Sequence, residues 1–263
     1  MQHNRSFWSY FRKAKGRHGV HSPFVYQLAD TCLTTKVEKN FNNSRKKWFV
    51  ELKADKTLFL INDLGAGSKH LTQKRSRSQL LKNSSSKGIY GDVLYKLARF
   101  YQPATILELG TSLGIGTVHL KKGAPNAHII TVEGCENTLS QACRSFDYWD
   151  MHGITTIRSS FLEFLEQPSP FRYDLIFIDG HHDGIATLNY LEKLQQFSHD
   201  QTLFIFDDIR WSDDMWQAWQ QIIQDERFHV TIDLGRMGLV WKRPEQTKEH
   251  FVLRPKIWKT KFY

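Results

Sequence analysis

Acidic and histidine side chains follow two apolar runs of the chain. Asp179 ends the first run, and His182 comes three residues later. Asp207 and Asp208 come at the end of the second run. If the two runs are neighbouring parallel strands, their carboxyl ends lie at one edge of the sheet, where ligands bind in such folds. We therefore expect three carboxylates and an imidazole to converge at this edge.

Two kinds of chemistry fit this group. Clustered carboxylates repel one another unless a cation or proton neutralises them, and oxygen ligands suit magnesium, manganese or calcium. Asp179, Asp207 and Asp208 are therefore predicted metal ligands. His182 is a candidate general base that would take a proton from a substrate hydroxyl or amine. Asp179 is the second candidate catalytic residue. The alternatives are structural: His182 makes a hydrogen bond within its turn, and Asp208 caps a helix or pairs with Arg210.

A glycine-rich turn lies further upstream, between an apolar run and a helical pattern. Gly110, Gly114 and Gly116 allow a tight turn and a close approach of the backbone to a ligand, which a helix N-terminus also favours. The dinucleotide fingerprint has glycines at relative positions one, three and six, whereas here they stand at one, five and seven. This spacing argues against a nicotinamide cofactor. Glu133 ends the next apolar run, where a carboxylate accepts hydrogen bonds from ribose hydroxyls.

A second glycine turn, Asp63 to Ser68, follows an earlier apolar run at residues 57–63. No helical pattern follows it, and no further strand ends in an acid. We interpret it as a tight turn or part of a substrate rim and not as a cofactor site.

Strand patterns alternate with helical patterns through most of the chain. The predicted strands cover residues 105–109, 128–133, 154–159, 173–179 and 202–207. Short apolar strands separated by helices indicate a parallel sheet covered on both faces. Two last runs, at residues 228–234 and 237–242, are joined too closely for a parallel crossover. The predicted fold is therefore α/β: a doubly wound, Rossmann-like sheet with a C-terminal antiparallel hairpin at its edge.

Charge divides the chain unevenly. Residues 1–101 carry 20 Lys and Arg against 6 Asp and Glu, within a net charge of +9. A basic front end suits nucleic acid, an anionic membrane surface or an acidic substrate, or it is a solvated extension. We predict a basic, partly helical N-terminal extension at residues 1–88 with a mobile loop at 69–87. The catalytic domain is predicted at 89–245 and a C-terminal tail at 246–263.

The composition bounds the location. No apolar run approaches the roughly 20 residues that cross a bilayer, and no signal-peptide pattern opens the chain. The three cysteines are too few and too scattered for a disulfide framework. A cytoplasmic protein without a membrane span is expected.

The stretch from Tyr90 to Trp241 resembles class I S-adenosylmethionine-dependent methyltransferases. The E-x-G-x-x-x-G-x-G loop at residues 108–116, the acid at Glu133 and the closing hairpin match that family. The spacing between Gly91 and Gly110 is similar to catechol-type O-methyltransferases. The I-D-G-x-H sequence at residues 178–182 resembles a bacterial group of the family.

The resemblance implies S-adenosylmethionine as the cofactor. Glu133 would hold its ribose, and Ser160 and Phe161 would border its adenine. The residues expected around its methionine end are Gly110, Thr111, Ser112 and Gly114, with Glu108 behind them. Catechol-type enzymes bind magnesium through an Asp and a later Asp-Asn pair, and here Asp208 stands in the place of the Asn.

The implied function is O-methylation of a small-molecule acceptor. One alternative is an RNA or protein methyltransferase that docks its substrate on the basic N-terminal region. The chain lacks an N-P-P-Y-type signature of base amino-group methylation, so nucleic acid is not favoured. A non-catalytic S-adenosylmethionine-binding protein is the other alternative. The oligomeric state is left open.

Overall fold

The computed structural model describes residues 2–16, 19–62, 72–84, 86–168 and 171–255. The chain forms two compact units. Residues 1–35 and 169–263 make up one, named here the terminal unit, and residues 36–168 make up the central unit. The predicted boundaries at residues 88 and 245 fall inside these units, and the three-part division stays a prediction.

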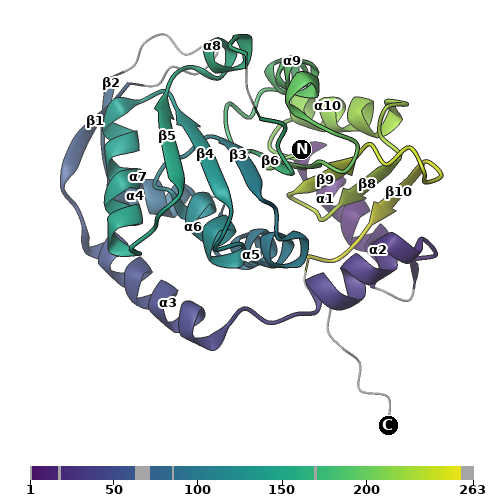
Figure 1. The fold of residues 1–263 in the computed structure, drawn as a ribbon, viewed down its shortest axis with the longest axis horizontal. Coiled ribbons are helices and arrows are strands. Elements are labelled where there is room, and N and C mark those ends of the chain that lie inside the picture. The colour runs from purple at the N-terminus through teal and green to yellow at the C-terminus, as the bar shows by residue number, and fades with distance from the viewer. Residues whose placement is uncertain (1, 17–18, 63–71, 85, 169–170, 256–263) are drawn as a thin grey trace. The chain divides into compact units, whose positions relative to one another are not determined.

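Three parallel strands form the middle of the central unit. They are β3 (Thr105–Leu109), β4 (His128–Glu133) and β5 (Ile154–Arg158), paired in the order β3-β4-β5. In Figure 1 they run side by side. The helices that alternate with these strands are α5 (Ile89–Tyr101), α6 (Ile115–Gly123), α7 (Glu136–Tyr148) and α8 (Phe161–Glu166). The predicted alternation of strands and helices is confirmed here.

A hairpin and two further helices complete the central unit. They are α3 (Lys39–Ala54), β1 (Leu58–Asn62), β2 (Thr72–Ser76) and α4 (Arg77–Asn83). β1 pairs antiparallel with β2. The loop predicted at residues 69–87 is therefore wrong over residues 72–83. A capping box begins α4 within this basic segment. The Ser76 side chain accepts from the Gln79 backbone N–H, and the Gln79 side chain accepts from the Ser76 backbone N–H.

α3 belongs to the core of the central unit. Phe41, Trp48 and Leu52 are buried in one cluster together with residues of α4, α5, α6 and α7. Their spacing places them on one face of a helix. This periodic signal is present in the sequence, although the sequence analysis did not use it.

Five strands form the sheet of the terminal unit. They are β6 (Leu175–Ile178), β7 (Leu203–Phe206), β8 (Val230–Asp233), β9 (Gly238–Trp241) and β10 (Glu249–Val252), in the order β6-β7-β9-β8-β10. β9 is antiparallel to both β7 and β8, as the hairpin prediction requires. The hairpin does not form the edge, because β10 pairs in parallel with β8. β10 lies within the predicted tail, and its short, polar sequence gave little strand signal.

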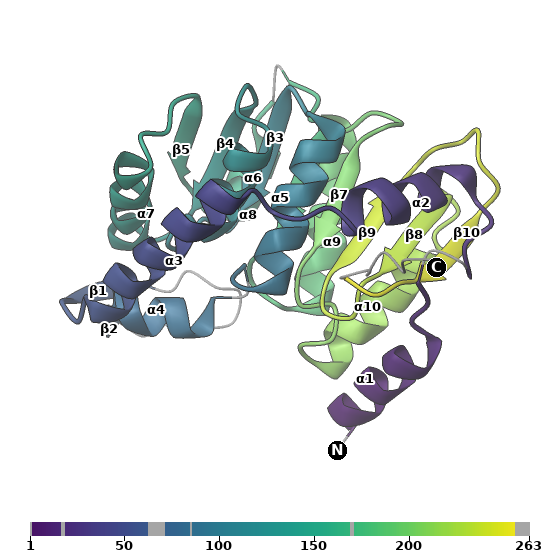
Figure 2. The ribbon, with the colours of Figure 1, turned by 90° about the horizontal axis from the view of Figure 1, so that it is seen from below.

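Helices cover both faces of this sheet. α9 (Gly184–Leu194), the 3-10 helix η3 (Gln195–Phe197) and α10 (Asp213–Gln224) come from the C-terminal part. Ser212 caps α10, since its side chain accepts from the Met215 N–H. Trp219 of α10 packs against Phe206 on one face, whereas Phe24 packs against Trp241 on the other. Figures 1 and 2 show α10 and α2 on opposite sides of these strands.

The N-terminal segment of the terminal unit contains α1 (Gln2–Lys13), α2 (Pro23–Gln27) and the π-helix η2 (Leu28–Leu33). Lys15 forms an isolated parallel bridge with Leu253, and Tyr10 Oη donates to the Leu253 carbonyl over 2.9 Å. The first residues of the chain thus bind directly to the segment that follows β10.

All three cysteines are described, and none forms a disulfide. Within the described residues, no helix has the length and apolar character to span a membrane.

Candidate functional site

The turn after β3 adopts a backbone that glycine favours. Gly110 has φ 105° and Gly114 has φ 73°, both in the region that side chains rarely adopt. The Gly110 N–H donates to the Val132 carbonyl over 3.0 Å, and the Gly114 N–H donates to the Thr111 carbonyl over 2.7 Å. These bonds fix the turn against the end of β4. Ser112 also has a positive φ and is exposed at its tip.

Glu133 locks this turn to the one after β4. One carboxylate oxygen accepts from the Ser112 N–H over 3.0 Å, and the other accepts from the Cys135 N–H over 3.0 Å. The side chain is half-buried at the end of its strand. A carboxylate fixed in this way presents negative charge at the carboxyl edge of the strand, where a ribose can donate to it.

Glu108 lies beneath the turn and is completely buried. Its Oε2 accepts from Thr131 Oγ1 over 2.6 Å and from Thr117 Oγ1, while Oε1 has no hydrogen-bond partner among the described residues. Burial raises the pKa of this carboxyl to about 7, against the stabilising effect of the threonine hydroxyls. Thr111 Oγ1 bonds to Thr131 over 2.7 Å, so the Thr111 side chain points into this network.

We expect Glu108→Gln to change how stability depends on pH. The pKa of the folded carboxyl lies above its ordinary value of 4.5, so the contribution of Glu108 is fully present below that value and is lost as the pH rises to about 7. Relative to the Gln variant, the wild type should lose about 3 kcal/mol of unfolding free energy across this window. Urea unfolding at a series of pH values measures the difference, and parallel curves for the two proteins would contradict it.

Ser160 and Phe161, the predicted adenine contacts, begin α8. Ser160 is the N-cap: its hydroxyl accepts from the Glu163 N–H over 3.3 Å, and its own N–H donates to the Glu163 carboxylate over 3.1 Å. Phe161 is buried. Ser160 therefore has a structural role, and the adenine contact stays a prediction.

The turn after β6 carries two consecutive histidines with positive φ, 65° at His181 and 37° at His182. Strained backbone of this kind persists only where its surroundings hold it, and it is frequent at functional sites. His181 Nδ1 makes a short hydrogen bond with Tyr190 Oη. His182 Nε2 lies 3.5 Å from Asp208 Oδ2, and its ring lies 5.6 Å from the exposed ring of Trp211.

Arg236 is the residue that the sequence analysis missed. Its Nε lies 2.6 Å from Asp208 Oδ1, and its Nη2 donates to Asp208 Oδ2 over 2.9 Å. The same Nε lies 3.5 Å from Asp207 Oδ1. Arg236 belongs to the tight link between β8 and β9, which the sequence analysis treated only as a hairpin turn. Hairpin pairing with β7 brings this link to the end of that strand.

One guanidinium faces the three carboxylates of this cluster. Burial lowers the pKa of Arg236, but attraction to Asp207, Asp208 and Asp179 outweighs this and raises it. Burial and the nearby Asp207 charge raise the pKa of Asp208, while Arg236 and His182 act in the opposite direction. The guanidinium thus supplies the positive charge that clustered carboxylates require.

The residues present do not fit the predicted metal site. Asp208 is occupied by Arg236, and among the described residues no three His, Cys, Asp or Glu side chains are arranged to hold a metal ion. The reason is the guanidinium, which binds the carboxylates that a cation would need. The alternative partner for Asp208 was also wrong, because Arg210 instead binds Asp233 over 2.7 Å. The second glycine turn, Asp63 to Ser68, lies outside the described residues.

Residues 107–209 match a sequence family described as a methyltransferase domain. No match was found among curated proteins.

Solved structures share the fold at low sequence identity. A Staphylococcus aureus protein assigned as a caffeoyl-CoA O-methyltransferase is 19% identical, with a TM-score of 0.56 over 63% of this chain and 90% of its own. An O-methyltransferase from Bacillus cereus, in complex with S-adenosylhomocysteine, is 19% identical, with a TM-score of 0.52 over 62% and 89%. TomG, an O-methyltransferase from Streptomyces achromogenes in complex with S-adenosylmethionine, is 15% identical, with a TM-score of 0.52 over 79% and 98%.

Proposed function

Since this chain carries a class I methyltransferase domain, we propose that it transfers a methyl group from S-adenosylmethionine to a hydroxyl oxygen of a small molecule. The observation that carries the proposal is the Gly110–Gly114 turn locked to Glu133 through the Ser112 N–H. The neighbours crystallised with S-adenosylmethionine or S-adenosylhomocysteine support the same cofactor here.

The cofactor residues act by shape and charge. Gly110 allows close approach to the methionine end, and the exposed Ser112 lies beside it. Gly114 shapes the turn, because its missing Cβ leaves room for the Phe146 ring. Glu133 accepts from the ribose hydroxyls and would repel a phosphate at the 2′ position. When bound, S-adenosylmethionine supplies a methyl group on a positively charged sulfur. Glu108 lies behind these residues, buried among threonine hydroxyls, and supports the turn from below.

The terminal unit supplies the groups that suit an acceptor hydroxyl. His182 is the proposed general base, and Asp208 beside it orients its ring. Trp211 offers an exposed aromatic face next to His182, which suits a flat acceptor. Asp179 is half-buried at the end of β6 and contributes negative charge to this cluster. A small acceptor agrees with the O-methyltransferases that share the fold.

We expect Glu133→Ala to weaken the binding of S-adenosylhomocysteine at least tenfold. The variant loses the ribose acceptor and the carboxylate that holds the Ser112 N–H. Losing hydrogen bonds to a charged group costs roughly 1.5–3 kcal/mol, and 1.4 kcal/mol is a factor of ten in affinity. Isothermal titration calorimetry measures the change, with NAD as the ligand that should not bind.

Glu136→Ala is the matched control, because Glu136 is an exposed acid near Glu133 that pairs with Arg158 over 2.9 Å. Tight binding of NAD, or equal S-adenosylhomocysteine binding by wild type and Glu133→Ala, would contradict the cofactor assignment. Methyl transfer is then followed with catechol and with RNA as acceptors. Transfer to RNA alone would promote the nucleic-acid alternative, and cofactor binding without transfer to any acceptor would favour a non-catalytic binder. A cytoplasmic location stays part of the proposal.

A further inference from the structure

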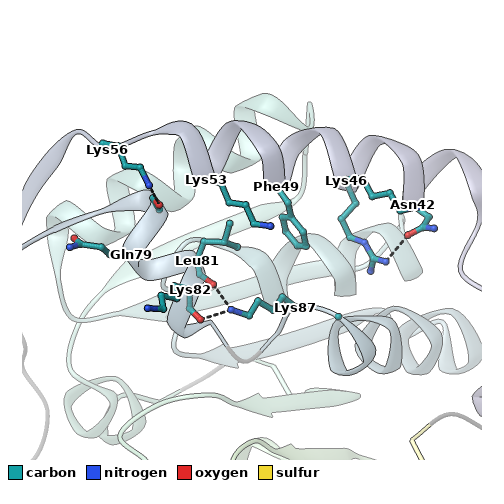
Figure 3. Close-up of a pocket in the computed structure, with 12 residues that line it drawn as sticks. Asn42, Lys46, Phe49, Lys53, Lys56, Gln79, Leu81, Lys82 and Lys87 are labelled. Atoms are coloured by element: carbon teal, nitrogen blue, oxygen red, sulfur yellow. Dashed lines mark hydrogen bonds between the residues drawn. The ribbon is translucent and has the colours of Figure 1, made fainter.

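A groove of about 830 Å³ lies within the central unit, between α3 on one side and α4 with Lys87 and Gly88 on the other (Figure 3). α3 contributes one wall, and α4 with the residues after it contributes the other. Neither the glycine turn after β3 nor Glu133 lines it. A volume of this size matches a pocket for one small organic molecule.

The charge of this groove is one-sided. Six of its lining side chains are cationic and none is acidic: Arg45, Lys46, Lys53, Lys56, Lys82 and Lys87. Like charges gathered in one concave site raise the local concentration of anions. The sign of the groove therefore selects an anionic ligand.

Three of the six cationic side chains form an ion pair or hydrogen bonds with other residues of the protein. Arg45 binds Asp92 over 2.6 Å and is buried. Lys56 donates to Ser78 Oγ over 2.7 Å, and Lys87 donates to the Leu81 and Lys82 carbonyls. Figure 3 shows the last two bonds.

The other three, Lys46, Lys53 and Lys82, are exposed lysines for which the described residues offer no acidic partner. Lys46 and Lys53 come from α3 and Lys82 from α4, so they lie on both walls. An anion placed between the walls meets ammonium groups from both sides. No carboxylate of the described part of the chain lines the groove beside these lysines. Asp92 pairs with Arg45, but Asp92 does not line the groove.

The groove also has an apolar part. Phe49 is half-buried and extends from α3 toward α4, where Leu81 is fully buried. An aromatic ring beside ammonium groups suits a ligand with a flat apolar body and an anionic end. A simple inorganic anion would leave this surface unused.

We propose that this groove binds a small organic anion that carries a phosphate or carboxylate group on an aromatic body. Lys46, Lys53 and Lys82 bind the anionic group, and the half-buried Phe49 contacts the ring. An extended nucleic acid is less well matched, because it needs a basic stripe along its backbone and the groove is the size of one small ligand. The proposal rests on contacts within the central unit and is independent of methyl transfer.

The test uses the full chain and 1-naphthyl phosphate as the probe, followed by fluorescence titration. Saturating S-adenosylhomocysteine is present, so that the probe does not occupy the cofactor site. The triple variant Lys46→Gln, Lys53→Gln, Lys82→Gln should bind the probe at least tenfold more weakly. Phe49→Ala should weaken the binding of 1-naphthyl phosphate and leave the affinity for inorganic phosphate unchanged.

A second triple variant, Lys36→Gln, Lys39→Gln, Lys47→Gln, is the matched control. It removes the same charge from exposed lysines on or beside α3 that do not line the groove, and its affinity should stay within twofold of wild type. Circular dichroism and thermal unfolding verify that every variant is folded.

Three outcomes would overturn the proposal. The first is no measurable binding of 1-naphthyl phosphate by the wild type. The second is an equal loss in the two triple variants, which would reduce the effect to net charge. The third is an oligoribonucleotide that binds more tightly than the probe and loses its affinity in the groove variant, which would make this face a nucleic-acid surface.

Discussion

Replacing Gly110 with valine is expected to weaken S-adenosylhomocysteine binding by about a hundredfold. Gly110 has φ 105°, a conformation that is essentially restricted to glycine, and valine is the kind of branched residue that tolerates it least. Strain of this kind costs roughly 1–3 kcal/mol, and a turn that relaxes it moves Thr111 and Ser112 away from their places. A loss near 2.7 kcal/mol corresponds to the hundredfold change. Calorimetry measures it directly.

Gly16→Val is the control for this experiment. Among the described residues, no atom lies within 4 Å of the position that its Cβ would take, so the same substitution should be tolerated there. Gly114→Ala should behave like Gly110→Val, because its φ is 73° and its Cβ would come within 2.5 Å of the Phe146 ring. Unchanged cofactor affinity in both turn variants would remove the turn from the binding site.

The cofactor half of the site could be predicted from sequence because its signals are local. The glycine turn lies between β3 and α6, and Glu133 follows four strand residues with buried side chains. Short-range rules about glycine, strand ends and helix starts therefore locate it. What those rules did not give is the bond from Ser112 to Glu133, which joins residues on different strand ends.

The charge cluster could be predicted only in part. The sequence places Asp179, Asp207 and Asp208 at strand ends, as the structure confirms. It does not show what neutralises them, because Arg236 lies 28 residues beyond Asp208 and reaches it through the pairing of β9 with β7. Composition pointed to a metal, since three carboxylates without a visible cation usually require one. The pairing of strands far apart in the sequence brings the guanidinium to these carboxylates.

Segments of low hydrophobicity were the hardest to predict. β2 has the sequence T-Q-K-R-S and β10 has E-H-F-V, so neither shows the apolar alternation of a half-buried strand. Both depend on tertiary pairing: β2 on β1, and β10 on β8. Local propensity does not contain that information.

The second large expected effect is on the stability of a variant that lacks Arg236, the cation in the carboxylate cluster. Arg236→Gln removes the guanidinium and leaves Asp207 and Asp208 nearly inaccessible to solvent and without their ion-pair partner. Breaking a buried pair from one side costs about 3–5 kcal/mol, because an uncompensated charge stays in the interior. We expect the unfolding free energy of Arg236→Gln to fall by about 3 kcal/mol, as urea unfolding would measure.

The same variant distinguishes a guanidinium site from a metal site. If Arg236 supplies the cation, neither EDTA nor added magnesium should change the thermal stability or the methyl transfer of the wild type. Magnesium should instead stabilise Arg236→Gln, whose carboxylates then lack a positive partner. Adding Asp208→Asn to Arg236→Gln removes one of the two charges and should recover part of the lost stability. A wild type that loses transfer in EDTA and regains it with magnesium would show that the carboxylates bind a metal in preference to Arg236.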